Sequence, residues 1–200
     1  MNNDCTDPIL EIVTSRQRAL VLNDICAVVC SLATVAVDGS PRVRVMNLNG
    51  ISGRSFELHC SEQSGKWKEL VQSPAYELLL WWPSVARQYR IRGELEIMPQ
   101  SLVQQSWLRA PYSFKLLDRF YEEYQPLGSQ LQNQQVLLSA INSLKTKYPS
   151  EQDVPPPKHL RGIYCKANWI EALYIDNLRI HERHCYSYTD HHWRHELLVP

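Results

Sequence analysis

The sequence predicts an α+β protein that is mainly β, built on an antiparallel, barrel-like sheet of about six strands with helices beside it. Apolar, β-branched runs lie early and late in the chain, whereas helical spacing of apolar residues runs from about 100 to about 147. No strand–helix–strand alternation of the kind that a doubly wound fold needs is visible. The 200 residues, 44% of them hydrophobic, suit one domain over 1–200 with a helical insert at about 100–147 and C-terminal strands at about 160–200.

Local signals place the individual elements. Asp7 is a candidate N-cap and Pro8 a first helical residue, so a helix is expected over 7–23. Asp38, Gly39 and Ser40 form a hairpin signal between two apolar runs. Strands are expected over 26–37, 41–51, 54–60, 75–84, 86–99, 160–176, 175–188 and 191–200. Helices are expected over 61–74, 100–110, 114–124 and 129–148, with a proline-rich connector over 149–159.

Charge and composition exclude several classes of protein. Lys+Arg and Asp+Glu both number 21, so no broad basic surface is expected for nucleic acid or an anionic membrane. No apolar run approaches the roughly 20 residues of a membrane span, and the N-terminus lacks a signal-peptide pattern. The six cysteines are scattered without a Cys-x-x-Cys pair. We therefore expect a cytoplasmic protein with reduced thiols, mostly in the core, and no metal site.

The segment "IDNLRIHERHCYSY", residues 175–188, carries cationic side chains at every second position. Alternate side chains of a strand point to the same face, so Arg179, His181 and Arg183 would line one side. Ile180 and Glu182 would occupy the other side, with Ile180 buried against the core. A core does not accept three such polar groups without partners. The polar face must therefore meet either water or an anion.

Two other expected strands repeat the pattern. Arg42 and Arg44 share one face of "PRVRVMN", with valines on the other, and Gln88, Arg90 and Arg92 share one face of "RQYRIRG". Acidic residues lie mostly outside these cationic faces, with Glu94 and Glu182 as the near exceptions. A solvated sheet face and an anion pocket both stay open as interpretations. Arginine suits the second because its planar guanidinium binds phosphate in a bidentate manner.

The segment "SEQSGKWKEL" adds a second candidate anion site. Ser64 and Gly65 precede an expected helix, and Lys66 lies in its first turn. The first-turn amides and the dipole of a helix favour phosphate. A Ser-Gly-Lys sequence is weakly specific by itself, because small polar residues cap many helices.

The clustered histidines and the two adjacent tryptophans have structural interpretations. The histidine cluster lacks a helical pair with a carboxylate partner, so surface or structural roles are favoured over a metal or haem site. Trp81 and Trp82 are expected to pack in the core rather than to form a stacking platform. The clustered histidines are His181, His184, His191, His192 and His195.

The order of these segments resembles the pyridoxamine 5'-phosphate oxidase family, whose members are FMN-binding split β-barrels. The resemblance runs from about residue 20 to the C-terminus, through "PRVRVMNLNG", "FELHCSEQSGKWKEL" and "HWRHELLVP". Its most specific motifs are Arg-Gln-x-x-x-x-Gly at 87–93 and Arg-x-His-x-Arg at 179–183. The resemblance implies a homodimer with two FMN molecules in clefts at the subunit interface.

The resemblance also implies a role for individual residues. Arg179 and His181 match the pair that faces the substrate and would be catalytic. His59 and Cys60 match positions where the backbone and a hydroxyl touch the flavin, and Gln88 matches the glutamine at its ring. The implied cofactor-binding residues are Arg44, Ser64 and Lys66 at the phosphate, with His59, Cys60, Gln88 and Arg183 along the flavin.

The chain departs from the family pattern at several positions. Asn49 replaces a substrate-binding lysine, Gly65 replaces an arginine of the phosphate loop, and Leu173 replaces a tryptophan beside the flavin. Arg109 and Tyr112 are the available substitutes for the substrate-phosphate groups, but they are out of register. The flavin site is mostly retained and the vitamin-phosphate site is eroded, as in a shorter, divergent branch of the family.

Two classes of function follow. The first is an FMN-dependent oxidoreductase that oxidises a small substrate, such as a pyridoxine-type phosphate, by hydride transfer to FMN with reoxidation by oxygen. The second is a non-catalytic flavin- or haem-binding split-barrel protein. The intact Arg179, His181 and Arg183 favour the first, whereas Asn49 and Leu173 favour the second.

Overall fold

A computed structural model describes residues 7–175 and 180–200. Its helices are α1 (Pro8–Val21), α2 (Gly65–Gln72), α3 (Gln100–Leu108), α4 (Tyr112–Glu123) and α5 (Gln134–Lys147). Its strands are β1 (Val29–Val35), β2 (Pro41–Asn47), β3 (Gly50–Ser52), β4 (Ser55–Ser61), β5 (Tyr76–Trp82), β6 (Arg87–Ile97), β7 (Leu160–Ile175), β8 (His181–Thr189) and β9 (His192–Leu198). Short 3-10 turns lie at Ile25–Val28 and Pro83–Val85.

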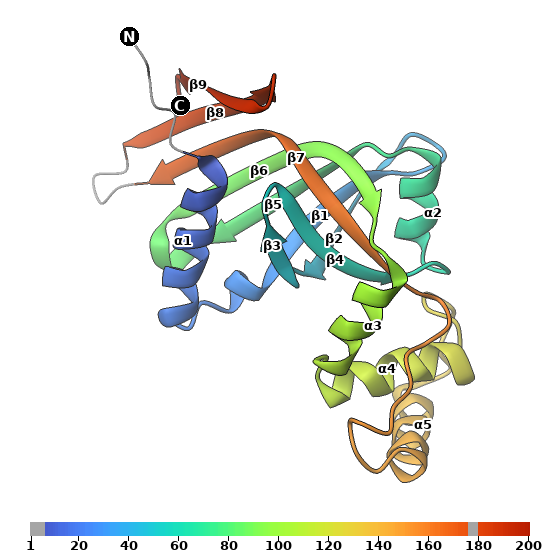
Figure 1. Ribbon diagram of the computed structural model, residues 1–200. Helices are drawn as coiled ribbons and strands as arrows, with labels where there is room; N and C mark the ends of the chain where they lie inside the picture. Colours follow the sequence, from blue (N-terminus) through green and yellow to red (C-terminus); the bar gives the residue numbers. More distant parts are fainter. Residues whose placement is uncertain (1–6, 176–179) are drawn as a thin grey trace. The chain divides into compact units, whose positions relative to one another are not determined.

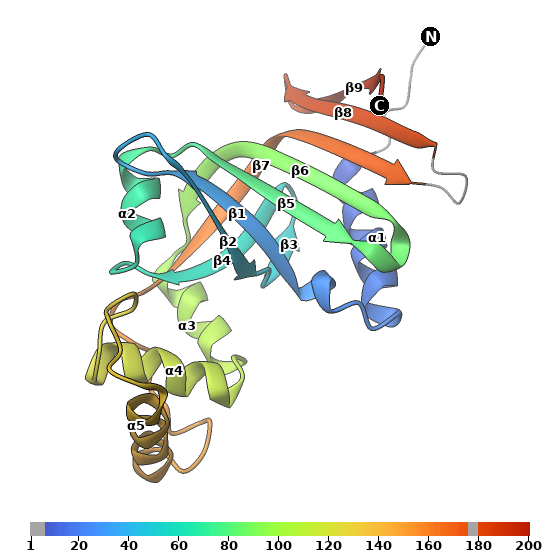
Figure 2. The same cartoon turned by 180° about the vertical axis from the view of Figure 1, so that it is seen from behind.

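The strands form one sheet that curls into a half-barrel (Figures 1 and 2). The strand order is β2-β1-β5-β6-β7-β4-β3, and β8 and β9 continue from β7. Pairing is antiparallel from β2 through β1 and β5 to β6, and again from β7 through β8 to β9. The predicted antiparallel split barrel is confirmed. Over the described residues the sheet has nine strands rather than about six: each of the eight expected segments contains a strand, and the segment expected over 41–51 divides into β2 and β3.

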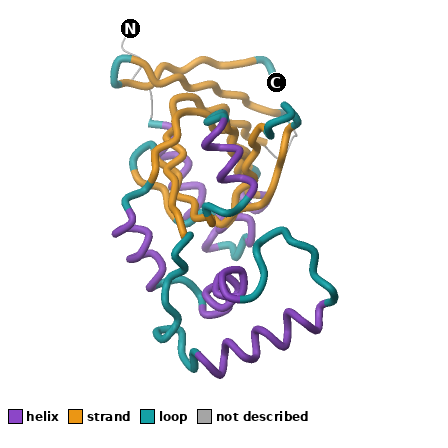
Figure 3. Tube along the Cα trace, turned by 90° about the vertical axis from the view of Figure 1, so that its right-hand side faces the viewer, coloured by secondary structure: helices purple, strands orange, loops and turns teal. Residues whose placement is uncertain are grey.

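The chain divides into two compact units. Unit 1 comprises the described residues up to 58, together with 69–96, 163–175 and 180–200, and contains most of the sheet and α1. Unit 2 comprises residues 59–68 and 97–162. It contains the helices α3, α4 and α5. Figure 3 shows these three helices as purple coils joined by loops.

Alternation along the strands builds the core of unit 1. Leu32, Leu78 and Ile91 are fully buried and lie opposite one another across β1, β5 and β6. Helix α1 begins as predicted, because the Asp7 carboxylate accepts a hydrogen bond from the Ile9 amide at 2.9 Å. We call the face of the sheet that carries these fully buried side chains the inner face, and the face of the opposite parity the outer face.

Unit 2 has a separate core under its three helices. The Trp107 indole donates to the Val154 carbonyl at 3.0 Å. Lys115 is 2% exposed, and its ammonium donates to the carbonyls of Leu108 at 3.2 Å and Glu151 at 3.1 Å. Leu108 ends α3, so the lysine satisfies a carbonyl that the helix leaves without a partner. None of the described helices is long and apolar enough to cross a membrane.

Two expectations about burial are wrong. Ile180 is 63% exposed rather than packed in the core. Trp82 is fully buried as expected, but Trp81 is 38% exposed on the outer face. Trp81 and Trp82 keep the period of two along β5, but the side that neighbouring elements cover depends on the pairing of distant strands. Ile180 precedes β8, which begins at His181.

Candidate functional site

Arg44 projects from the inner face of β2 into a small polar cluster. Its register partner is Leu32, so its side chain lies on the side of Thr34. Its guanidinium donates to the Glu69 carboxylate at 2.6 Å and to the Thr34 hydroxyl, which itself donates to Glu69. The Thr34 hydroxyl and then Arg44 hold the pKa of Glu69 below its usual range. Arg44 is therefore a fixed cation, attached to α2 through Glu69.

The same helix begins at the predicted phosphate loop. Ser64 is 2% exposed, and its hydroxyl donates to the Ser61 carbonyl at 2.6 Å and accepts from the Trp67 amide at 3.4 Å. These bonds fix the start of α2, where Gly65 and Lys66 form the first turn. The positive end of the helix dipole and the lysine thus lie at one point of unit 2.

His59 and Cys60 lie next to each other on β4 and point to opposite sides. The buried Nε2 atom of His59 has no hydrogen-bond partner among the described residues, and burial lowers the pKa of its ring. Burial also raises the pKa of the Cys60 thiol to about 11, although Lys66 and Arg161 oppose the shift. Both side chains are therefore neutral near pH 7, and His59 has an unused polar atom.

Cations and carboxylates alternate along the outer face of the sheet. The Arg90 guanidinium donates to Glu77 at 2.7 Å and to Glu171 at 3.2 Å, and Arg183 donates to Glu171 at 2.8 Å. Arg92 also donates to Glu77. We call Glu77, Arg90, Arg92, Glu171 and Arg183 the arginine–glutamate ladder; its members come from the four strands β5, β6, β7 and β8.

The ladder corrects the expectation that acidic residues lie mostly away from the arginines. Glu77 and Glu171 come from strands that the sequence presents as apolar, "YELLLWW" and "NWIEALYI". Each glutamate stands at the parity that places it on the outer face beside an arginine of the next strand. A lone glutamate inside each apolar strand was the available signal for this pairing.

Three further predicted residues have less defined surroundings. Gln88 lies opposite Trp81, and its half-buried side chain has no hydrogen bond to any described residue. His181 lies opposite Ile175 at the parity of Arg183, so these two predicted neighbours share a face. Arg179 lies outside the described residues.

The predicted cofactor ligands of unit 1 divide between the two faces of the sheet. Arg44 shares the inner face with Leu32, which pairs with Leu78 on β5, which in turn pairs with Ile91 on β6. Gln88 is three residues from Ile91 and therefore lies on the outer face, as do Arg183 and the rest of the ladder. One chain therefore does not present Arg44 and Arg183 on the same face of the sheet.

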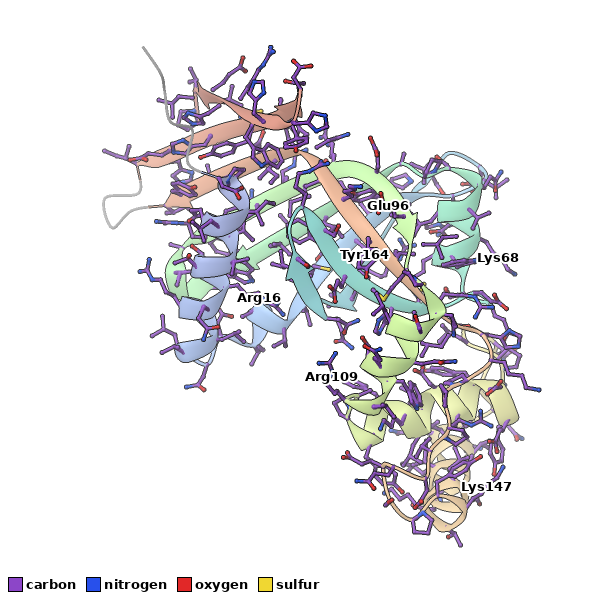
Figure 4. All side chains as sticks on the ribbon, in the orientation of Figure 1. Arg16, Lys68, Glu96, Arg109, Lys147 and Tyr164 are labelled. Atoms are coloured by element: carbon purple, nitrogen blue, oxygen red, sulfur yellow. The ribbon has the colours of Figure 1, made fainter. Side chains whose placement is uncertain are left out.

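The positions that depart from the family pattern have their own surroundings. The Tyr112 hydroxyl donates to the Tyr148 carbonyl at 2.6 Å, so it is occupied at the C-terminal end of α5. Arg109 follows α3 and is exposed (Figure 4). Asn49 is exposed as well. Leu173 lies directly opposite Arg183 in the β7–β8 register. The structure therefore assigns Tyr112 a structural hydrogen bond.

Two of the clustered histidines, His184 and His195, meet on the β8–β9 hairpin. His184 Nδ1 and His195 Nε2 are 2.9 Å apart, and their stacked rings have centroids 5.1 Å apart. The rings of Tyr174 and Tyr186 lie 4.8 Å from His184 and His195, respectively. Burial and then His184 lower the pKa of His195. Within the described ranges, no group of three or more His, Cys, Asp or Glu is arranged to hold a metal ion.

The fold and these residues define a class of protein, the split β-barrels with flanking helices. Solved structures agree. PhzG from Burkholderia lata, determined with tetrahydrophenazine-1-carboxylic acid, matches with a TM-score of 0.84 at 20% identity, over 100% of this chain and 95% of its own. A pyridoxamine 5'-phosphate oxidase-related, FMN-binding protein from Nostoc punctiforme matches with a TM-score of 0.78 at 17% identity, over 98% and 99%. At these identities the likeness shows the fold.

The sequence defines the family more narrowly. The family profile described as pyridoxamine 5'-phosphate oxidase matches residues 23–148. Pyridoxine/pyridoxamine 5'-phosphate oxidases from Gloeothece citriformis and Acaryochloris marina are 30% and 29% identical over 171 and 170 residues. Each alignment covers 85% of this chain, and 78% and 75% of the relatives. The chain belongs to the pyridoxamine 5'-phosphate oxidase family, as the sequence motifs predicted.

Proposed function

We propose that the protein binds FMN and uses it to oxidise a small substrate. The observation that carries the proposal is the polar start of α2: Ser64 caps the helix, Lys66 lies in its first turn, and Glu69 of the same helix holds Arg44. A lysine and a helix N-terminus in unit 2 suit a single terminal phosphate, and the family pattern adds Arg44 of unit 1 as a second cation. The chain's family, whose curated relatives are named as oxidases, supports the redox role.

The residues that are present fit the cofactor. Arg44 and Lys66 supply cations for the phosphate. Ser64 donates its hydroxyl proton to the Ser61 carbonyl and so fixes the start of α2, whose first-turn amides would bind the phosphate. Elsewhere, the unpartnered Nε2 of His59 and the side chain of Gln88 offer unused polar groups for the ring system. Bound FMN would accept a hydride from substrate and return the electrons to oxygen.

The chain's own residues would bind and orient the reactants. We assign Arg183 to the flavin, and Arg179 and His181 to the substrate. His181 would hold or move a proton and Arg179 would stabilise developing charge. Cys60 contributes backbone contacts, because a neutral thiol is a weak hydrogen-bond donor.

A second copy of the chain would complete the site. Arg44 and Arg183 lie on opposite faces of the sheet, so we propose that each cofactor takes Arg44 from one chain and Arg183 from its partner. The outer face also carries apolar side chains that a second copy would cover. The exposed fractions are 70% for Val43, 68% for Val45, 36% for Leu79 and 38% for Trp81. The two compact units of each chain would together form one functional domain.

The second candidate function is flavin binding without catalysis. Asn49 stands where the oxidases have a lysine, and the Tyr112 hydroxyl is already bonded to the Tyr148 carbonyl. These observations favour a substrate other than a pyridoxine-type phosphate, or no substrate. Haem binding has no comparable support, because the two histidines of the β8–β9 hairpin that lie side by side, His184 and His195, are hydrogen-bonded to each other.

Anaerobic mixing of the FMN-loaded protein with pyridoxamine and pyridoxine 5'-phosphates tests the choice. An oxidase predicts loss of the visible flavin absorption with one of them and its return on admission of air. Retained absorption with both compounds overturns the vitamin-phosphate oxidase assignment. FMN binding without reduction by either compound then favours the non-catalytic alternative.

A further inference from the structure

Glu171 is a buried carboxylate held between two arginines. The residue is 6% exposed and lies in the C-terminal half of β7. One carboxylate oxygen accepts from Arg90 Nη1 at 3.2 Å and the other accepts from Arg183 Nη2 at 2.8 Å. Such a buried carboxylate is tolerated only when it is paired and hydrogen-bonded, and both of its oxygens are occupied here.

The two arginines depend on Glu171 to different degrees. Arg90 also donates to both oxygens of Glu77, at 2.7 and 3.2 Å, so it keeps a bidentate partner without Glu171. Arg183 has no other ion pair with a described residue, and its side chain is 34% exposed. One of its terminal nitrogens bonds to Glu171, which leaves other N–H donors of the same planar group for a ligand. Glu171 therefore determines the direction of Arg183.

We propose that Glu171 is a positioning residue for the cofactor site, and that it orients the Arg183 guanidinium before the flavin binds. The inference rests on the proposed function, in which Arg183 faces FMN. An arginine side chain has several rotatable bonds and loses conformational entropy when it is immobilised. A guanidinium that is already held by a carboxylate loses less of this entropy on contact with a ligand, which favours binding.

The ladder itself provides a matched control. Glu77 is a carboxylate of the same ladder, with a side chain that is 26% exposed, and it bonds to Arg90 and Arg92 but not to Arg183. Glu77→Gln therefore disturbs the ladder to a similar extent and leaves Arg183 paired with Glu171. Glu171→Gln keeps the size of the side chain but turns one acceptor oxygen into an amide that cannot accept from an arginine.

The experiment is a double-mutant cycle on full-length apoprotein, titrated with FMN and followed by flavin fluorescence. We expect Glu171→Gln to weaken FMN binding about tenfold when Arg183 is present, and less than about twofold in an Arg183→Ala background. Glu77→Gln should leave FMN affinity within about twofold of the parent. Thermal unfolding of each apoprotein reports the purely structural effect, which we expect to be similar for the two glutamine variants.

Each other outcome contradicts the proposal. Equal losses of FMN affinity in the two backgrounds would show that Glu171 does not act through Arg183. Equal losses for Glu77→Gln and Glu171→Gln would reduce Glu171 to a general stabilising role. If Glu171→Gln does not fold, Glu171→Asp replaces it in the same cycle. The aspartate keeps the negative charge, but its side chain is shorter by one methylene group. A parent protein without FMN affinity overturns the proposed function as well, whereas a parent that binds FMN equally after Glu171→Gln overturns only this inference.

Discussion

Replacement of Arg44 is the sharpest mutational test of the phosphate site. Arg44→Ala removes the guanidinium that Thr34 and Glu69 hold on the inner face of β2. A hydrogen bond to a charged group contributes about 1.5–3 kcal/mol. We therefore expect FMN affinity to fall by roughly tenfold to a hundredfold or slightly more. Fluorescence titration of the apoprotein measures this loss directly.

The effect of the same substitution on stability should be small. The Arg44 and Glu69 side chains are 22% and 15% exposed, and Glu69 keeps its bond from Thr34 in the variant. Loss of a partly exposed ion pair costs about 1 kcal/mol or less. For a chain of this size we expect the apoprotein melting temperature to fall by no more than about 2–4 °C.

Arg42 supplies the control for this prediction. It lies two residues from Arg44 at the same parity of β2, opposite Thr34, and it is exposed. Arg42→Ala removes an equal charge and should leave FMN affinity within about twofold of the parent. An Arg44→Ala protein that binds FMN as tightly as the Arg42→Ala protein would refute the phosphate site. So would a loss of affinity that merely follows the loss of folded protein.

Three further predictions test the fold and its electrostatics. A Cβ on Gly93 would lie 1.9 Å from the Lys166 carbonyl oxygen. We therefore expect Gly93→Ala to lower the free energy of unfolding, measured in urea, by about 3 kcal/mol or more. An alanine variant as stable as the parent would contradict the β6–β7 packing. Asp190 and His191 form the turn between β8 and β9, with φ of 54° and 65°. His191→Gly should therefore stabilise the protein by about 1 kcal/mol. An unchanged urea midpoint would argue against that turn. Burial raises the pKa of Asp118 to about 6, opposed by Lys66, so the folded state binds this proton more tightly than the unfolded state. The parent should therefore lose about 2 kcal/mol relative to Asp118→Asn as pH rises from about 4 to about 6, and parallel stability curves for the two proteins would contradict this.

The sequence predicted best those features that depend on local chemistry. Asp7 and Pro8 specify the start of α1, and the helices expected over 100–110, 114–124 and 129–148 correspond to α3, α4 and α5. Such caps and apolar periods act within a few residues of one another, so one segment contains the whole signal.

The features that were missed depend on which strands pair. The two-residue period of Arg90 and Arg183 gave their parity, but the carboxylates beside them, Glu77 and Glu171, belong to other strands. In the same way, the period places Val43 correctly on the face opposite Arg44, yet it is the valine that is exposed. A period of two says which residues share a face, and only the tertiary pairing and any partner chain decide what covers it.

The most direct test of the central claim is FMN binding by mixtures of two defective chains. Arg44→Ala and Arg183→Ala proteins are each titrated with FMN, then mixed as unfolded chains, refolded together and titrated again. If each cofactor takes Arg44 from one chain and Arg183 from its partner, every mixed dimer regains one intact site and the mixture recovers tight FMN binding. If the mixture binds FMN no better than the two separate variants, the two chains do not share the cofactor site in this way, and the central claim is contradicted.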